Sequence, residues 1–108
     1  MRISIDPAAV DPAELLERDE FTSFDVAVPP GTTVAELSAV LGSVGELDAL
    51  GEDLTTAHVR VSVEWLRQTA HAEGADGAWD EQFEGMLAHA EGRGWVEGGT
   101  VRAHVVEL

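Results

Sequence analysis

Apolar and polar residues alternate with a period of two in several short segments of the chain, and this alternation is typical of half-buried β-strands. The segments are 2–5, 24–28, 58–61 and 101–105. The last of these and the apolar pair Trp95-Val96 flank Gly98-Gly99, which favours a tight hairpin turn. The pattern therefore predicts five strands, of which the last two form a hairpin.

Capping residues mark the starts of two helices in the first half of the chain. Asp11 followed by Pro12 is typical of a helix start and predicts a short helix that ends near Arg18. Thr33 and Glu36 have the spacing of a capping box and predict a second helix. The apolar face of that second helix consists of Val34, Leu37 and Leu41.

Two more helices are expected in the second half. Ser62 is the expected cap of the first, whose inward-facing side chains are Trp65, Leu66 and Ala70. The second has the clearest amphipathic spacing in the chain, carried by Trp79, Phe83, Met86, Leu87 and Ala90. Residues 43–57 show no period and contain two glycines and four acids, so we expect a loop there.

The expected order of elements is β-α-β-α-β-α-α-β-β. Because the strands alternate instead of being apolar throughout, we expect one mixed sheet with helices on one face only. The prediction is a small two-layer α+β sandwich, formed by residues 1–108 as a single domain. A chain of 108 residues is long enough to bury a core without disulfides.

The chain is strongly acidic, and this charge limits the classes of partner that it can bind. It has 21 Asp and Glu against six basic residues, all of them Arg, and a formal net charge of −15. Proteins bind nucleic acids mainly by placing Lys and Arg on phosphates, so we expect no direct nucleic-acid partner and no anionic membrane surface. The acidity is compatible with simple solubility, with a basic protein partner or with imitation of nucleic acid.

Other features of the sequence bear on the cellular location of the protein. No apolar run approaches the roughly 18 residues of a membrane helix. The first residues lack the apolar segment of a signal peptide. Cysteine is absent, which excludes disulfides and thiolate chemistry. We therefore expect a cytoplasmic location.

One short motif occurs twice and raises the question of a metal site. Ala-His-Ala-Glu-Gly stands at 70–74 and again at 88–92. Residues two apart on a helix diverge by about 200°, so His and Glu of one copy would not converge on one ion. Each copy instead has the composition of a helix end, with Gly as the terminator. We expect no metal, no cofactor and no catalytic residues, although His71 or His89 with nearby acids is the alternative.

Four basic residues form one candidate binding site. His58 and Arg60 occupy one face of their strand, and Arg102 and His104 occupy one face of theirs. If the two strands share a sheet, these side chains lie together on its helix-free face, where they could hold a carboxylate or an acidic peptide. The alternative is that they form ordinary cross-strand ion pairs with neighbouring acids.

The order helix, strand, helix, helix, hairpin across residues 33–106 resembles a winged helix-turn-helix domain. The passage from Leu87 through Trp95 to Arg102 is similar to a recognition helix entering its wing. The resemblance implies a DNA-binding regulator. The corresponding helix, however, carries the acids Asp80, Glu81, Glu84 and Glu91. DNA would repel that face, so we expect any such regulator to have lost DNA binding.

A second resemblance concerns the C-terminal part of the chain. The series Trp79, Phe83, Met86, Leu87, Ala90, Gly94 and Trp95, followed by Val-Arg-Ala-His at 101–104, is similar to small uncharacterised proteins from GC-rich bacteria. This resemblance implies a bacterial origin and assigns no functional residues.

These observations favour a non-enzymatic protein of unknown function that acts by binding another protein or its own copy. The first alternative is a protein or enzyme that binds a small anion through His58, Arg60, Arg102 and His104. The second alternative is the winged-helix-like regulator without DNA binding.

Overall fold

The structure is a computed structural model that describes residues 1–49, 51 and 53–108. Its strands are β1 (Arg2–Ile5), β2 (Ala13–Leu16), β3 (Asp25–Val28), β4 (Gly45–Asp48), β5 (His58–Ser62), β6 (Val96–Glu97) and β7 (Thr100–Glu107). Its α-helices are α1 (Val34–Leu41), α2 (Val63–Ala72) and α3 (Gly77–Gly92). Single 3₁₀ turns occupy Gly42–Val44 and Leu54–Thr56. The expected α+β class with one mixed sheet is confirmed.

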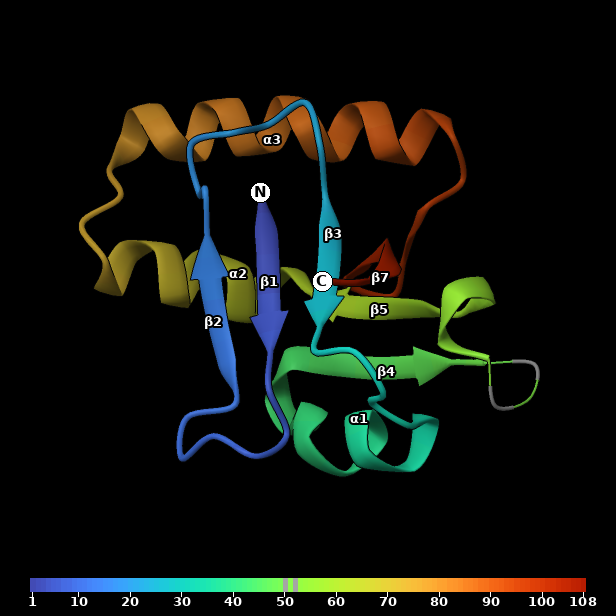
Figure 1. The fold of residues 1–108 in the computed structure, drawn as a ribbon. Coiled ribbons are helices and arrows are strands. Elements are labelled where there is room, and N and C mark those ends of the chain that lie inside the picture. The colour runs from blue at the N-terminus through green and yellow to red at the C-terminus, as the bar shows by residue number, and fades with distance from the viewer. Residues whose placement is uncertain (50, 52) are drawn as a thin grey trace.

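The strands form one sheet in the order β2-β1-β3-β7-β5-β4, and the short β6 pairs with β7. The pairs β1–β3 and β3–β7 are parallel, and the other pairs are antiparallel. The sheet is curled, so that β1, β2 and β3 run across the direction of β4 and β5 (Figure 1). The strand β7 connects the two halves, because it pairs with β3 near its end and with β5 near its start.

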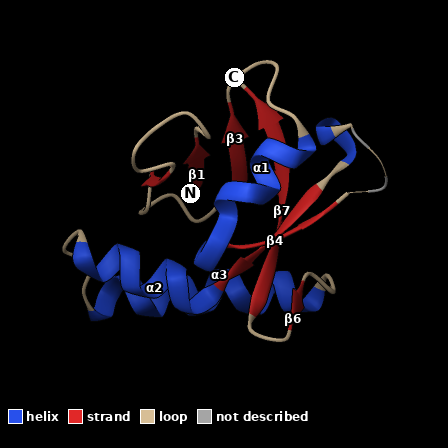
Figure 2. Ribbon diagram, turned by 90° about the horizontal axis from the view of Figure 1, so that it is seen from below, coloured by secondary structure: helices blue, strands red, loops and turns tan. Residues whose placement is uncertain are grey.

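The helices lie around the apolar interior of the curled sheet. In Figure 1, α3 lies at one end of the vertical strands and α1 at the other end. Figure 2 shows α2 and α3 side by side, away from α1. Ile3, Val26 and Val59 of the sheet, Leu37 of α1 and Phe83 of α3 are all fully buried in one cluster. The ring of Phe83 stacks on Trp79, with ring centroids 4.7 Å apart.

The capping and turn signals in the sequence act as expected in three places. The Thr33 side chain accepts a hydrogen bond from the Glu36 N–H at 3.1 Å, and the Glu36 carboxylate accepts one from the Thr33 N–H at 3.0 Å. The Ser62 hydroxyl accepts the Trp65 N–H at 3.1 Å and starts α2. Gly98 and Gly99 both have positive φ, 57° and 79°, as the β6–β7 hairpin requires.

The prediction of a helix after Asp11 is wrong. Ala13–Leu16 is strand β2, which pairs antiparallel with β1. A helix of one or two turns gains few hydrogen bonds for the entropy it loses, whereas pairing with β1 satisfies the same backbone groups and buries Leu15. The Asp6 N–H donates to the Pro12 carbonyl at 2.8 Å and closes the loop between the two strands.

The prediction of a loop at 43–57 is wrong in part, because this segment contains strand β4. Residues 50 and 52 of the segment lie outside the described residues. Gly45, one of the two glycines of this segment, lies within the β4–β5 pair opposite Val61. A Cβ at this position would overlap the carbonyl oxygen of Arg60. Glycine is therefore what allows β4 to approach β5 here.

Among the described residues, no helix has both the length and the apolar character needed to cross a membrane.

Candidate anion-binding pocket

The structure brings the four basic residues of the sequence prediction onto one face of two paired strands. His58 stands opposite His104, and Arg60 stands opposite Arg102, across the antiparallel β5–β7 pair. The imidazole rings of His58 and His104 have centroids 4.8 Å apart. The alternating pattern of the two strands therefore predicted correctly which side chains share a face. The expectation that this face is free of helices is wrong, because α3 contributes to the pocket beside three of these residues.

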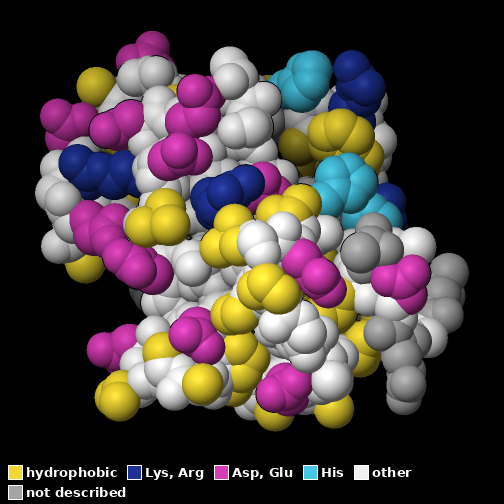
Figure 3. Space-filling view, viewed as in Figure 1, with side chains coloured by type: hydrophobic (Ala, Val, Ile, Leu, Met, Phe, Trp, Pro, Cys, Tyr) yellow, Lys and Arg dark blue, Asp and Glu magenta, His cyan; other side chains and the backbone are white. Residues whose placement is uncertain are grey.

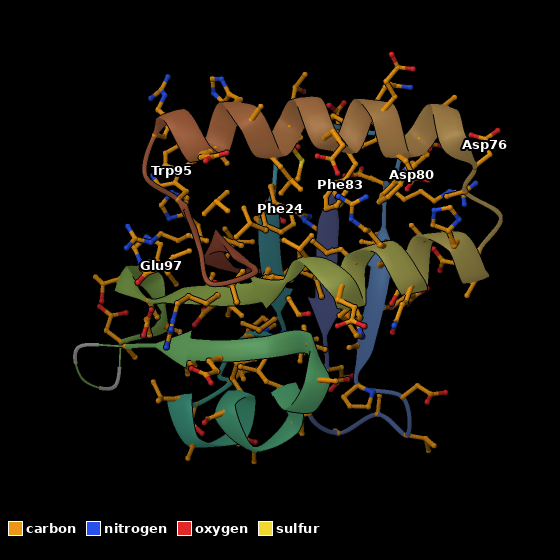
Figure 4. All side chains as sticks on the ribbon, turned by 180° about the vertical axis from the view of Figure 1, so that it is seen from behind. Phe24, Asp76, Asp80, Phe83, Trp95 and Glu97 are labelled. Carbon is orange, nitrogen blue, oxygen red and sulfur yellow. The ribbon has the colours of Figure 1, made fainter. Side chains whose placement is uncertain are left out.

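A pocket of about 530 Å³ lies beside three of these four residues. His58, Arg102 and His104 line its strand side. Its helix side is lined by Met86, His89, Ala90 and Arg93 of α3, and the remaining lining residues are Phe21, Thr22, Ser23, Phe24, Trp95 and Val101. Figure 4 shows Trp95 below the end of α3 that leads into β6, and Phe24 at β3.

Arg60 does not line this pocket. Its Nη2 lies 2.8 Å from a Glu46 oxygen, and its Nε lies 2.8 Å from an Asp48 oxygen, both on the neighbouring strand β4. It borders a separate hollow that also contains Glu46 and Glu97. The alternative of ordinary cross-strand ion pairs therefore applies to Arg60.

The pocket is lined by basic side chains without carboxylates. Five of the ten Arg and His residues line it, and none of the described Asp or Glu residues does. Figure 3 shows histidine and arginine side chains gathered at the upper right, over the end of α3 and β7, with acidic side chains spread over the rest of that face. In a chain of net charge −15, this is a local concentration of positive charge.

Two arginines of the pocket differ from the other four. Arg2, Arg18, Arg60 and Arg67 each form an ion pair with an Asp or Glu. In the described part of the chain, Arg93 and Arg102 form none; the Arg93 guanidinium lies over the Trp95 ring, 5.6 Å from its centroid. Their charges are therefore available to a ligand.

Burial, together with the nearby His104 and Arg102, lowers the pKa of His58 below its ordinary value, while Asp48 acts in the opposite direction. The physical cause is the loss of water around the ring and the proximity of other positive groups.

The residues from α3 were missed in the sequence analysis. His89 and Arg93 reach the pocket because α3 packs beside β6, which pairs with β7, and no local pattern specifies that packing. The available signal was the spacing of Met86, His89, Ala90 and Arg93, which places all four on one helix face. Only the apolar members of that face were used in the prediction.

The turn after α3 fixes the position of Trp95. The Gly94 N–H donates to the Glu91 carbonyl at 3.0 Å, and the Trp95 N–H donates to the Ala90 carbonyl at 2.9 Å. Gly94 has a φ of 77°, which permits this helix-ending turn. The indole of Trp95 is left 39% exposed beside the pocket.

Phe21 and Phe24 also line the pocket, and the segment 17–24 that contains them is held by contacts with the helices. The indole N–H of Trp79 donates to the Arg18 carbonyl at 2.8 Å. The Arg18 guanidinium donates to the Ala70 carbonyl at 3.1 Å. Phe21 packs on Trp79 with ring centroids 5.9 Å apart. These contacts hold the segment in place beside the pocket.

The repeated His-Ala-Glu-Gly motifs lie at the ends of α2 and α3. Gly74, with a φ of 99°, terminates α2 as expected, but α3 continues through Gly92 and turns at Gly94. His71 Nε2 lies 2.8 Å from Asp80, and His89 lines the pocket. Within the described residues, no three His, Asp or Glu side chains are placed to hold a metal ion.

No protein-family model, curated protein or solved structure matches this chain. The arrangement can bind an anion through Arg93, Arg102 and the histidines, and it can hold an apolar group against Phe24 and Trp95.

Proposed function

We propose that this chain is a non-catalytic binding module for a small organic anion. The observation that carries the proposal is the pocket of about 530 Å³ with five basic side chains and, among the described residues, no carboxylate in its lining. Pockets for small ligands generally enclose about 300–1,000 Å³ and combine apolar walls with a few polar groups. Arg102 and Arg93 supply permanent charge, and Phe24, Met86 and Trp95 supply apolar surface.

A probe with one permanent charge and an aromatic body tests this proposal. Naphthalene-1-sulfonate carries such a charge, and naphthalene-1-sulfonamide is its neutral analogue. Isothermal titration calorimetry should detect binding of the sulfonate and at least about tenfold weaker binding of the sulfonamide, because hydrogen bonds to charged groups contribute about 1.5–3 kcal/mol. Equal affinity for the two compounds, or no binding of the sulfonate, would overturn the proposal.

Two arginine variants locate the binding. Arg102→Gln removes a pocket charge and should weaken sulfonate binding by about tenfold. Arg67→Gln removes an arginine that pairs with Glu84 outside the pocket, and it should leave the affinity unchanged. Equal effects of the two substitutions would show that the sulfonate responds only to overall charge.

A second candidate function is binding of another protein or of a second copy of the chain. The observation that favours it is Trp95, which is 39% exposed and lies under Arg93, because Trp and Arg are enriched at the centres of protein interfaces. Light scattering after size-exclusion chromatography tests self-association. Trp95→Ala should then dissociate any oligomer, and a strictly monomeric wild type would exclude a second copy as the partner.

The wider expectations from the sequence belong to this proposal as well. The observed order α1, β5, α2, α3, β6 and β7 follows the order expected for residues 33–106, with β4 added. A winged-helix-like regulator without DNA binding, a bacterial origin and a cytoplasmic location are kept as proposals on the sequence grounds given above.

A further inference from the structure

His58 and His104 form a close pair, called here the histidine pair, on one side of the pocket. They are direct partners across β5 and β7, with ring centroids 4.8 Å apart and ring planes 43° apart. Two imidazolium rings at this distance repel each other. Arg102, on the same face of β7, adds a permanent positive charge to that repulsion. The pocket without an anion therefore disfavours a doubly protonated pair.

The carboxylates that are register partners of the histidine pair both contact arginines. Asp48 of β4 is the register partner of His58, but it lies 2.8 Å from Arg60 Nε. Asp25 of β3 is the register partner of His104, but it accepts two hydrogen bonds from Arg2, at 2.7 and 3.0 Å. Asp25 is thus neutralised by Arg2. Asp48 shares Arg60 with Glu46 and still favours the protonated form of His58, but less than burial, His104 and Arg102 together disfavour it.

The other charged groups of the pocket are positive. Arg102 comes from β7, and His89 and Arg93 come from α3. An anion placed among these groups would reduce their mutual repulsion and would favour uptake of a proton by the histidine pair.

We propose that the pocket takes up its anion together with a proton, which is held by the histidine pair. This inference rests on the proposed anion-binding function and adds its regulation by pH. Because binding and protonation are linked equilibria, an anion that favours the protonated pair must itself bind more tightly to the protonated pocket. Acidification therefore strengthens binding.

The lowered pKa of His58 in the free protein supports tighter anion binding at lower pH. Burial and the neighbouring positive groups lower the pKa of His58, so its ring is neutral at neutral pH before the anion arrives. A bound anion raises that pKa. Between the lower and the higher pKa the affinity increases up to tenfold for each unit of pH decrease, as for any single linked proton.

Calorimetry with naphthalene-1-sulfonate tests the coupling, because this sulfonate does not titrate between about pH 5 and 8 and any proton exchange comes from the protein. We expect about tenfold tighter binding near pH 5.5 than near pH 7.5. At about pH 7, the binding enthalpy measured in two buffers of different ionisation enthalpy should differ, in the direction of proton uptake.

Four histidine variants identify where the proton goes. His58→Gln and His104→Gln should each reduce the proton uptake and flatten the pH dependence. His89→Gln should reduce both less than either pair variant does, since His89 lines the pocket but is not a member of the pair. His71→Gln is the matched control outside the pocket, where His71 pairs with Asp80. Uptake that survives in the two pair variants and disappears in His89→Gln would overturn the assignment.

The possible failures are distinguishable. Sulfonate binding with the same affinity at both pH values and no dependence on buffer would overturn the coupling and leave the proposed function intact. Absence of sulfonate binding at every pH would overturn the proposed function itself. If a pair variant does not fold, the histidine proton resonances of the wild type provide the answer: saturation with the sulfonate should raise the pKa of His58, and an unchanged value would contradict the inference.

Discussion

Arg2 holds the carboxylate of Asp25 at two points, with its Nε 2.7 Å from one oxygen and its Nη2 3.0 Å from the other. The same contact raises the pKa of Arg2. Asp25 is the register partner of His104, on the strand next to the pocket. The Arg2–Asp25 pair therefore withdraws a negative charge that would otherwise compete with an anionic ligand.

The first prediction follows from this relationship. Arg2→Gln leaves the Asp25 carboxylate without its arginine, so we expect weaker binding of naphthalene-1-sulfonate, by about threefold to tenfold. The double variant Arg2→Gln with Asp25→Asn should recover most of the affinity, because it removes the competing charge as well. Calorimetry on the wild type and both variants measures this. A double variant as weak as the single one would contradict the electrostatic explanation.

The second prediction concerns two glycines that differ in their surroundings. Gly45→Ala should lower the free energy of unfolding by about 1–3 kcal/mol, because the added Cβ overlaps the Arg60 carbonyl oxygen and separates β4 from β5. Gly85→Ala in α3 is the matched control, since nothing lies within 4 Å of its added Cβ. It should raise the stability by about 0.5–1 kcal/mol through helix propensity.

Urea unfolding of both glycine variants tests that contrast. The result that would contradict it is an equal change in the two variants, or a Gly45→Ala protein as stable as the wild type.

The third prediction concerns stability against pH in the absence of a ligand. The folded state lowers the pKa of His58, so the unfolded state binds this proton more readily. The contribution of neutral His58 to stability is therefore complete above the unfolded pKa of about 6.5 and is lost as the pH falls from there toward the folded pKa. His58→Gln should lose less stability than the wild type between about pH 7.5 and 5.5.

Urea midpoints at these two pH values measure the difference, and most carboxylates stay ionised across this range. An identical slope in the wild type and His58→Gln would show that His58 is not responsible.

The sequence predicted most of the fold where local signals and tertiary packing agree. The capping box of Thr33 and Glu36 and the turn at Gly98 and Gly99 are local features with strong geometric requirements, and both were predicted correctly. The signal at Asp11 was also local, but pairing with β1 satisfied more backbone groups than a short helix would have done.

The role of Gly45 could not be predicted from local sequence. Its role depends on the approach of the Arg60 carbonyl from a strand 15 positions further along the chain, and glycine in a segment without a period gives no sign of such a partner.

The candidate site, too, could be predicted from the sequence only in part. Alternation along two strands predicted that His58, Arg102 and His104 share a face. It did not predict that Arg60 would turn to two acids of β4, because β4 was expected to be loop. The contribution of Arg93 from α3 depends on how the curled sheet places that helix, which is a property of the whole core.

The most direct test of the central claim uses the three tryptophan indole N–H signals in a ¹H–¹⁵N NMR titration with naphthalene-1-sulfonate. Only Trp95 lines the pocket, whereas the indole N–H of Trp79 donates to the Arg18 carbonyl and Trp65 lies on α2. The account predicts a saturable shift of the Trp95 signal, with the Trp65 and Trp79 signals unmoved. A stationary Trp95 signal at saturating sulfonate, or an equal shift of all three, would contradict it.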